Sequence, residues 1–383
     1  MSTTPRILVI SFSPIHRDSR VLREISALAH HGRVTTVGYG TQPAGSAEHL
    51  RIPDRALSLP QTPSGVLTLA LRRLKRAEMA APGTKAALKL LEGRRFDLVV
   101  ANDARALPLA FAVAHGAPIW ADMHEWAPEE RTHVTSWRLL VAPLMDHICR
   151  TYLPRCDAVT TIGPSIADLY REHYGATARI VRNAAPRADL EPGPLAADGA
   201  IRLVHSGGAV PGRSIETMID AARLLPDHFT LDLYLVPGGD GGRYLRRLQE
   251  RAQGCDRIAF HAPVPPAELP ATLNAYDVGV FWIPPFNTNA RLTLPNKLFD
   301  FVQARLALAV GPTMEMVRVI EEFGLGVVSK DYSLDSIVET LSSLTPRQVA
   351  DYKRAAHSAA DILCFESEMA TIDRIVTTLL NRT

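Results

Sequence analysis

The stretch LPNKLFDFVQARLALAVGP, residues 294–312, gathers three polar side chains ahead of a run of apolar residues. The spacing of Asn296, Lys297 and Asp300 lets a helix bring all three toward one side. A lysine amine can neutralise a diphosphate, and a carboxylate can accept hydrogen bonds from two neighbouring hydroxyls of a ribose or another sugar. The alternative is a surface Lys–Asp pair, which stabilises a helix by roughly 0.2–0.5 kcal/mol.

The position of this helix favours the binding interpretation. The helix directly follows the polar loop PPFNTNARLT, which comes at the end of the apolar run VGVFWIP. Ligands of parallel α/β sheets bind just beyond the carboxyl ends of the strands. The same reasoning makes Glu315 a candidate, because it follows the next apolar run in the Gly-Pro turn GPTMEM.

A second candidate for anion binding is HSGGAVPGR, residues 205–213. Gly207 and Gly208 allow backbone N–H groups to approach an anion, and the N-terminus of the next helix adds positive potential. Arg213 can form a fork on phosphate oxygens. Gly-Gly turns are common, so this stretch supports a phosphate site only together with the helix that carries Lys297.

Three further polar residues follow apolar runs in the first half of the chain. Asp103 ends DLVVAND, and His124 and Glu125 end PIWADMHE. Their positions predict that they emerge at the carboxyl edge of a sheet. A histidine there can donate or accept hydrogen bonds near neutral pH, although it can also be a satisfied structural residue.

The elements that must position these residues alternate between strands and helices along the whole chain. The pattern predicts an α/β protein with two doubly wound, Rossmann-like domains facing a cleft. The linker is expected in the Pro- and Gly-rich residues 188–200. We expect an N-terminal domain over 1–190, a C-terminal domain over 198–356, and a final helix in 357–383 that packs back on the first domain. Strands are expected at 6–11, 34–40, 97–103, 118–124, 158–164, 178–183, 201–208, 231–237, 257–262, 278–284, 306–312 and 326–330.

Composition excludes several classes of protein. The net charge of +2 over 383 residues gives no basis for nucleic-acid binding. The four cysteines lack metal or redox spacing, no Asp-x-Asp pair occurs, and no G-x-G-x-x-G marks a dinucleotide. We therefore expect neither a metal nor a cofactor. The N-terminus has no basic-then-apolar leader and no apolar run is long enough to span a bilayer, which predicts a cytoplasmic protein.

One segment could bring the protein to a membrane surface. Residues 72–95 hold eight Lys or Arg and two Asp or Glu, just after the apolar SGVLTLAL. A basic and partly amphipathic segment can lie on an anionic leaflet. The alternative is a solvated helical face.

The sequence resembles the GT-B-fold glycosyltransferases, especially the retaining family 4, over nearly its whole length. The segment LPNKLFDFVQARLALAVGP is similar to the family block P-x-K-x-x-E-[YF]-x-x-x-G-x-P. PIWADMHEW is similar to the family strand that ends in Asp-x-His. DSRVLREISALAHHG and ATARIVRNAAP, which contains Asn183, resemble its first helix and the segment before its linker.

The resemblance implies a role for each matching residue. Asp300 would hold the ribose hydroxyls, while Lys297, Arg213 and the backbone at Gly207 and Gly208 would hold the diphosphate. His124 would contact the donor sugar. Asn296 and Glu315 are further donor-site candidates, and Asp103 and Glu125 are candidates on the acceptor side.

The sequence also departs from the family pattern. The ribose acid is Asp in place of Glu, Leu292 replaces a glutamate eight positions earlier, and Arg305 replaces a glycine. The resemblance implies a glycosyltransferase that uses a nucleotide-diphosphate sugar, with UDP favoured, and an acceptor hydroxyl of a glycan, a lipid-linked sugar or a small metabolite. Transfer with retention, without metal, in polysaccharide biosynthesis is expected. The alternatives are a sugar-nucleotide 2-epimerase and a catalytically silent binding protein of the same fold.

Overall fold

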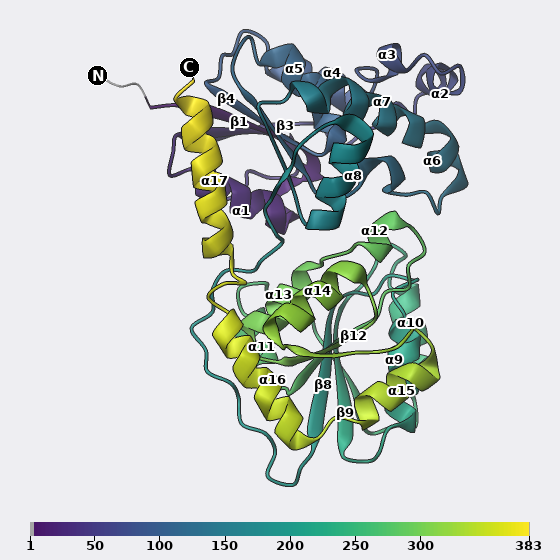
Figure 1. Cartoon of the computed structure of the whole chain (residues 1–383). Coiled ribbons are helices and arrows are strands. Elements are labelled where there is room, and N and C mark those ends of the chain that lie inside the picture. The colour runs from purple at the N-terminus through teal and green to yellow at the C-terminus, as the bar shows by residue number, and fades with distance from the viewer. Residues whose placement is uncertain (1–3, 383) are drawn as a thin grey trace. The chain divides into compact units, whose positions relative to one another are not determined.

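The structure, a computed structural model, describes residues 4–382 and divides into two compact units. The first unit comprises the chain up to Arg182, Asn287–Asn289 and the residues from Glu368 onward. Its seven parallel strands lie in the order β3-β2-β1-β4-β5-β6-β7 (Figure 1). They are β1 (Arg6–Pro14), β2 (Arg33–Tyr39), β3 (Glu48–Arg51), β4 (Leu98–Asn102), β5 (Ile119–Met123), β6 (Ala158–Thr161) and β7 (Arg179–Ile180).

The helices of the first unit connect these parallel strands. The α-helices are α1 (Ser19–Leu28), α2 (Pro63–Ala70), α3 (Leu74–Ala77), α4 (Pro82–Leu90), α5 (Leu107–Val113), α6 (Thr135–Leu140), α7 (Ala142–Tyr152), α8 (Pro164–Tyr174) and α17 (Phe365–Leu380). Short 3-10 helices occupy Ile15–Arg17, Ala104–Ala106, Ala127–Glu129 and Leu153–Arg155. Figure 1 shows α17 in yellow, beside the elements of the first unit. An ion pair of 2.5 Å between Arg182 and Glu368 fixes its start.

The second unit comprises Asn183–Phe286 and Ala290–Ser367. Its six parallel strands lie in the order β10-β9-β8-β11-β12-β13. They are β8 (Ile201–Gly208), β9 (Phe229–Val236), β10 (Ile258–His261), β11 (Val278–Phe281), β12 (Ala307–Val310) and β13 (Gly326–Val328). The helices are α9 (Ile215–Leu224), α10 (Arg243–Ala252), α11 (Leu269–Leu273), α12 (Thr288–Arg291, whose first residues belong to the first unit), α13 (Asn296–Gln303), α14 (Met314–Phe323), α15 (Leu334–Ser342) and α16 (Pro346–Ala359).

Both sheets have the doubly wound order that the alternating pattern predicts, which confirms the expected fold class. Each order reverses next to the first strand of its unit, between β1 and β4 and between β8 and β11. Ligands of such sheets bind at this reversal, beyond the carboxyl ends of the strands. The sequence missed β3, and it overestimated β7, which has only two residues. Among residues 4–382, no helix is long and apolar enough to cross a membrane.

Close packing holds α13, the helix that carries Lys297, against the second sheet. Leu298, Phe299 and Val302 are buried, as the sequence predicts. Phe301 lies against Gly279 of β11, where an added Cβ would lie 2.4 Å from the ring. The helix therefore sits as close to the strand as a glycine allows.

Arg305 stands where the family pattern that the sequence resembles has a glycine, and its contacts show how the chain tolerates the larger residue. Its φ is +61°, in the left-handed region that glycine adopts most readily. Its buried guanidinium donates hydrogen bonds to the carbonyls of Gln303 at 2.7 Å and Ala188 at 2.7 Å. These bonds satisfy the carbonyl of Gln303 at the end of α13 and that of Ala188, and they offset the backbone strain.

Replacing Gly279 by Ala is expected to displace Phe301 and lower the unfolding midpoint of the second unit. Overpacking of a well-packed core costs about 1–3 kcal/mol. Thermal or urea unfolding measures the effect, and Gly239→Ala is the control because nothing lies within 4 Å of its added Cβ. Equal midpoints for the two variants would show that α13 does not depend on this close approach.

Candidate functional site

The second unit holds an amine that is buried without an ion pair. Lys297 is 7% exposed, and its Nζ lies 3.2 Å from Nε2 of His205 and 4.3 Å from the centre of the Phe281 ring. Burial and the charge of Arg213 hold the pKa of Lys297 well below its usual value, and Asp300 opposes this shift. Within residues 4–382, no ion pair holds its Nζ. A buried cation without a counter-ion is costly unless an anion joins it.

His205 faces Lys297 as a neutral acceptor. Its Nδ1 lies 2.8 Å from the carbonyl oxygen of Val280, so Nδ1 carries the proton and Nε2 can accept from the lysine amine. Burial and the charges of Lys297 and Arg213 keep the pKa of His205 well below its usual value. The sequence analysis did not single out this residue, although it lies two residues before Gly207 in the predicted strand.

The Gly-Gly turn lies against the same lysine. Gly207 has φ of +131°, and an added Cβ there would be 3.1 Å from Nζ of Lys297. A side chain at this position would therefore be strained and would crowd the amine. Gly208 ends β8, and Arg213 lies five residues farther along, half-buried, with its pKa lowered by burial. The structure thus gathers two cations and a glycine turn at the reversal of the second sheet.

The remaining predicted residues of this unit lie around that centre with different partners. Asp300 is half-buried and close enough to act on the charge of Lys297. Asn296 is exposed at the first position of α13. Glu315 is 1% exposed in the first turn of α14, where Arg318 pairs with it at 3.1 Å. Their roles toward a donor stay predictions.

In the first unit, His124 lies between carboxylates at the ends of β4 and β5. Its Nε2 is 2.9 Å from Oδ1 of Asn102 and 3.4 Å from Oδ2 of Asp122, and its Nδ1 is 3.4 Å from Oδ2 of Asp103. Burial disfavours the charged ring, but Asp103 and Asp122 outweigh it and raise the pKa of His124 to about 9. The ring is therefore a cation at neutral pH, which can donate from both nitrogens.

A buried ion pair between Arg20 and Asp122 lies next to His124. Arg20 donates from Nε and Nη2 to both oxygens of Asp122, at 2.7 Å and 2.6 Å. The hydroxyl of Thr160 donates to Asp122 as well. Burial works against the charge of Asp122, yet Arg20 and His124 hold its pKa far below its usual value. The sequence analysis did not single out Arg20, and it included Asp122 only as part of the strand that ends in Asp-x-His.

The acceptor-side candidates lie close to His124. Asp103 has φ of +65° and accepts the backbone N–H of His124 at 3.1 Å. Glu125 follows His124 directly, and burial, Glu130 and Asp103 raise its pKa to about 8. Glu125 is therefore largely protonated at neutral pH and can donate a hydrogen bond. Within residues 4–382, no group of three or more acidic, histidine or cysteine side chains is arranged to hold a metal ion.

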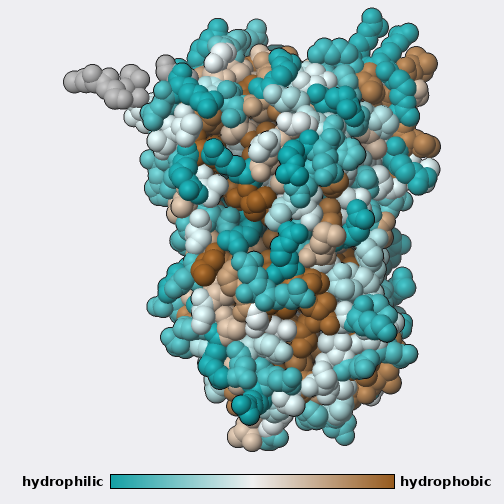
Figure 2. Space-filling model, viewed as in Figure 1, coloured by the Kyte–Doolittle hydropathy of each residue, from teal (hydrophilic) through white to brown (hydrophobic). Residues whose placement is uncertain are grey.

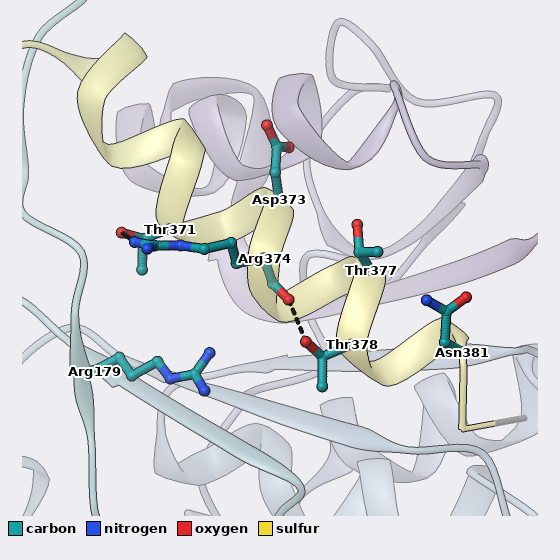
Figure 3. Close-up of a pocket in the computed structure, with 7 residues that line it drawn as sticks. All are labelled: Arg179, Thr371, Asp373, Arg374, Thr377, Thr378 and Asn381. Carbon is teal, nitrogen blue, oxygen red and sulfur yellow. Dashed lines mark hydrogen bonds between the residues drawn. The ribbon is translucent and has the colours of Figure 1, made fainter.

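A cavity of about 640 Å³ in the first unit contains none of these residues (Figure 3). It is lined by Arg179, Thr371, Asp373, Arg374, Thr377, Thr378 and Asn381. Figure 3 shows Arg374 running back along α17, where its Nη2 donates to Thr371, and the hydroxyl of Thr378 donating to the Arg374 carbonyl. The side chains of Arg374, Thr371 and Thr378 are therefore engaged within α17.

Comparison with protein families gives a match in the first half of the chain. Residues 19–185 match the family model of the glycosyl transferase 4-like domain. Among curated protein sequences, none matches the chain significantly. The match covers most of the first unit.

Solved structures show which fold the whole chain has. Sucrose-phosphate synthase from Thermosynechococcus elongatus is similar with a TM-score of 0.74 at 14% identity, over 99% of this chain and 100% of that chain. The α,α-trehalose 6-phosphate synthase from Burkholderia multivorans gives 0.66 at 12%, over 99% and 100%. HepE from Anabaena, in complex with UDP and glucose, gives 0.64 at 12%, over 98% and 100%. The chain has the GT-B fold, as the resemblance implies.

The protonation of His124 can be measured directly. Its ring is expected to titrate near pH 9 in a histidine NMR titration, and Asp103→Asn is expected to lower that pKa. Since 9 lies above the ordinary 6.5, the charged ring stabilises the fold fully below about pH 6.5, and this contribution is lost as the pH rises through about 9. The exposed Asp335→Asn serves as control. A ring that titrates below its ordinary value would contradict the assignment.

Proposed function

We propose that this chain, a glycosyltransferase by its domain match and its GT-B fold, moves a hexose from a nucleotide-diphosphate sugar to an acceptor hydroxyl. The donor we favour is a UDP-sugar. The acceptor class comprises a glycan, a lipid-linked sugar or a small metabolite, as in polysaccharide biosynthesis. Transfer proceeds with retention and without a metal ion or cofactor.

The observation that carries this proposal is the unpaired cation of Lys297. Nζ lies beside the Gly207 turn and Arg213 contributes a second positive charge, whereas Asp300 is the nearby carboxylate. A diphosphate would supply the missing negative charge. The backbone N–H groups at Gly207 and Gly208 would add donors that suit phosphate oxygens.

Asp300 gives the site its means of recognising the nucleoside. It lies one helical turn from Lys297, so a diphosphate on the lysine would place the neighbouring ribose within reach of the carboxylate. Two vicinal hydroxyls can donate to its two oxygens. Uridine is favoured because HepE, which shares the fold, was solved with UDP and glucose and with UDP-glucose.

The chemistry follows from where charge develops. Breaking the bond between the sugar carbon and the phosphate oxygen builds negative charge on the departing diphosphate. Lys297 and Arg213 stabilise that charge most as it forms. The acceptor hydroxyl forms the new bond from the leaving-group face, and its proton passes to a phosphate oxygen, so the enzyme supplies no nucleophile. His124 donates a hydrogen bond to the donor sugar.

Two other functions predict different products. A 2-epimerase would convert the sugar nucleotide without an acceptor, and a silent binding protein would release no nucleotide from any mixture. Leu292, at the place of the family glutamate, is 4% exposed and offers no acid or base there. Incubation with the donor alone, followed by separation of sugar nucleotides, distinguishes the epimerase from the transferase.

Replacing Lys297 by Met removes the charge but keeps most of the side-chain volume. Turnover is expected to fall by about two orders of magnitude, as it does when one donor to a developing oxyanion is removed. Nucleotide release from UDP-sugars with an acceptor panel measures it, and the exposed Lys330→Met is the control. Activity within about threefold of the parent chain would refute the role of Lys297.

A lipid-linked acceptor would require a surface that meets a membrane. The α2 segment exposes three apolar side chains, Val66 at 39%, Leu67 at 59% and Leu71 at 53%. Exposed basic residues follow at Arg72, Arg73, Lys75 and Arg76. Figure 2 shows brown residues beside teal ones at the corner that α2 occupies in Figure 1. Apolar insertion together with basic charge suits the cytoplasmic face of an anionic bilayer.

Vesicle sedimentation tests this surface. The chain is expected to pellet with phosphatidylglycerol vesicles at low salt and to stay in solution with phosphatidylcholine vesicles. Changing Leu67 and Leu71 together to Glu is expected to abolish pelleting, whereas Leu224→Glu, an equally exposed leucine on α9, leaves it unchanged. If the anionic vesicles pellet none of the parent protein, the membrane surface is wrong.

A further inference from the structure

Glu24 is a buried carboxyl group that the chemistry described so far does not use. It lies on α1, is 3% exposed, and its Oε1 accepts a hydrogen bond from Nδ2 of Asn102 at 2.9 Å. Its Oε2 is buried, and no hydrogen-bond partner for it is found among residues 4–382. Leaving a buried polar atom unsatisfied costs about 1–3 kcal/mol. This carboxyl is therefore poorly explained by stability alone.

The hydrogen bond from Asn102 to Glu24 determines which atom of the Asn102 amide faces His124. Because Nδ2 donates to Glu24, Oδ1 must point the other way, where it lies 2.9 Å from Nε2 of His124. A carbonyl oxygen can only accept, so Nε2 of the ring must carry a proton. Three side chains thus form a chain of hydrogen bonds that runs from the buried carboxyl to the ring.

The opposite nitrogen of the ring is held less closely. Nδ1 of His124 lies 3.4 Å from Asp103, which already accepts the backbone N–H of His124 through its other oxygen. The imidazole is also partly exposed, with 19% of its side chain accessible. Nδ1 is therefore the ring atom that is available to another hydrogen-bond partner.

We propose that Glu24 is a positioning residue that acts through Asn102 to hold Nε2 of His124 as a donor, so that Nδ1 is left to meet the substrate. The catalytic part of this inference rests on the proposed sugar transfer. The part that concerns the ring stands on the hydrogen bonds alone. The charges that surround Glu24 agree with a largely neutral carboxyl, since burial and Asp122 raise its pKa to about 8.

Two substitutions separate positioning from simple burial. In Glu24→Gln the side-chain carbonyl can still accept from Asn102, whereas Glu24→Met has similar length and no acceptor. The matched control is Glu78→Met, another buried glutamate of the first unit, which bonds Tyr152 and Lys75 instead. Should Glu24→Met fail to fold, Asn102→Leu interrupts the same chain at its middle residue.

Histidine-selective ¹⁵N NMR gives a readout that does not need activity. In the parent chain and in Glu24→Gln, we expect the Nε2–H signal of His124 to be shifted downfield and to exchange slowly with water. In Glu24→Met this signal is expected to move upfield and to exchange faster, while Glu78→Met leaves it unchanged. An unchanged His124 signal in Glu24→Met would overturn the positioning role, and so would an equal change in Glu24→Gln.

Kinetics then tests the substrate side. With a donor and acceptor that turn over, kcat is expected to fall about tenfold or more in Glu24→Met with little change in donor KM, and Glu24→Gln is expected to restore it. Normal kcat in Glu24→Met, despite an altered ring signal, would overturn the claim that the fixed ring serves catalysis. Absence of sugar transfer in the parent chain would refute the proposed function and leave the NMR test of the ring intact.

Discussion

A buried amine without a carboxylate partner is the feature on which the donor site depends. Lys297 is held by α13 near the end of β8, with a neutral imidazole 3.2 Å from its Nζ and the centre of an aromatic ring at 4.3 Å. Desolvation makes this arrangement unfavourable in the empty protein. In the proposed function this cost is recovered when a diphosphate binds, because its negative charge stabilises the protonated amine. His205, Gly207 and the contact of Phe301 with Gly279 all serve to keep that amine in place.

In the first unit, by contrast, the buried cation lies beside carboxylates. There His124 is held charged between the carboxylates of Asp103 and Asp122. A charged ring with a fixed orientation can donate hydrogen bonds to a sugar but cannot act as a base. This agrees with transfer in which a phosphate oxygen takes the acceptor proton. In the proposed function the two units contribute different chemistry: one would bind the diphosphate and the other would present an oriented hydrogen-bond donor.

The sequence predicted the fold because most strands end at a break in an apolar run, and parallel sheets place those breaks at one edge. For the same reason it predicted Lys297, Gly207 and His124 as residues near the ends of strands. It missed Glu24, Asn102 and His205 because they lie inside runs that read as apolar elements. Glu24 falls on the apolar stripe of α1, next to Val21 and Leu28, and that position could have marked it as buried. Hydrogen-bond partners far apart in sequence can be found only in the folded chain.

The most direct test of the central claim measures protons taken up when the donor binds. UDP-glucose has no phosphate group that titrates at or above neutral pH, so the phosphates do not take up protons in that range. Calorimetry in buffers of different ionisation enthalpy, repeated at increasing pH, should show proton uptake by the parent chain once its free amine loses its proton, because the diphosphate raises the lowered pKa of Lys297. The uptake should disappear in Lys297→Met. Binding without uptake, or equal uptake in the variant, would contradict the account.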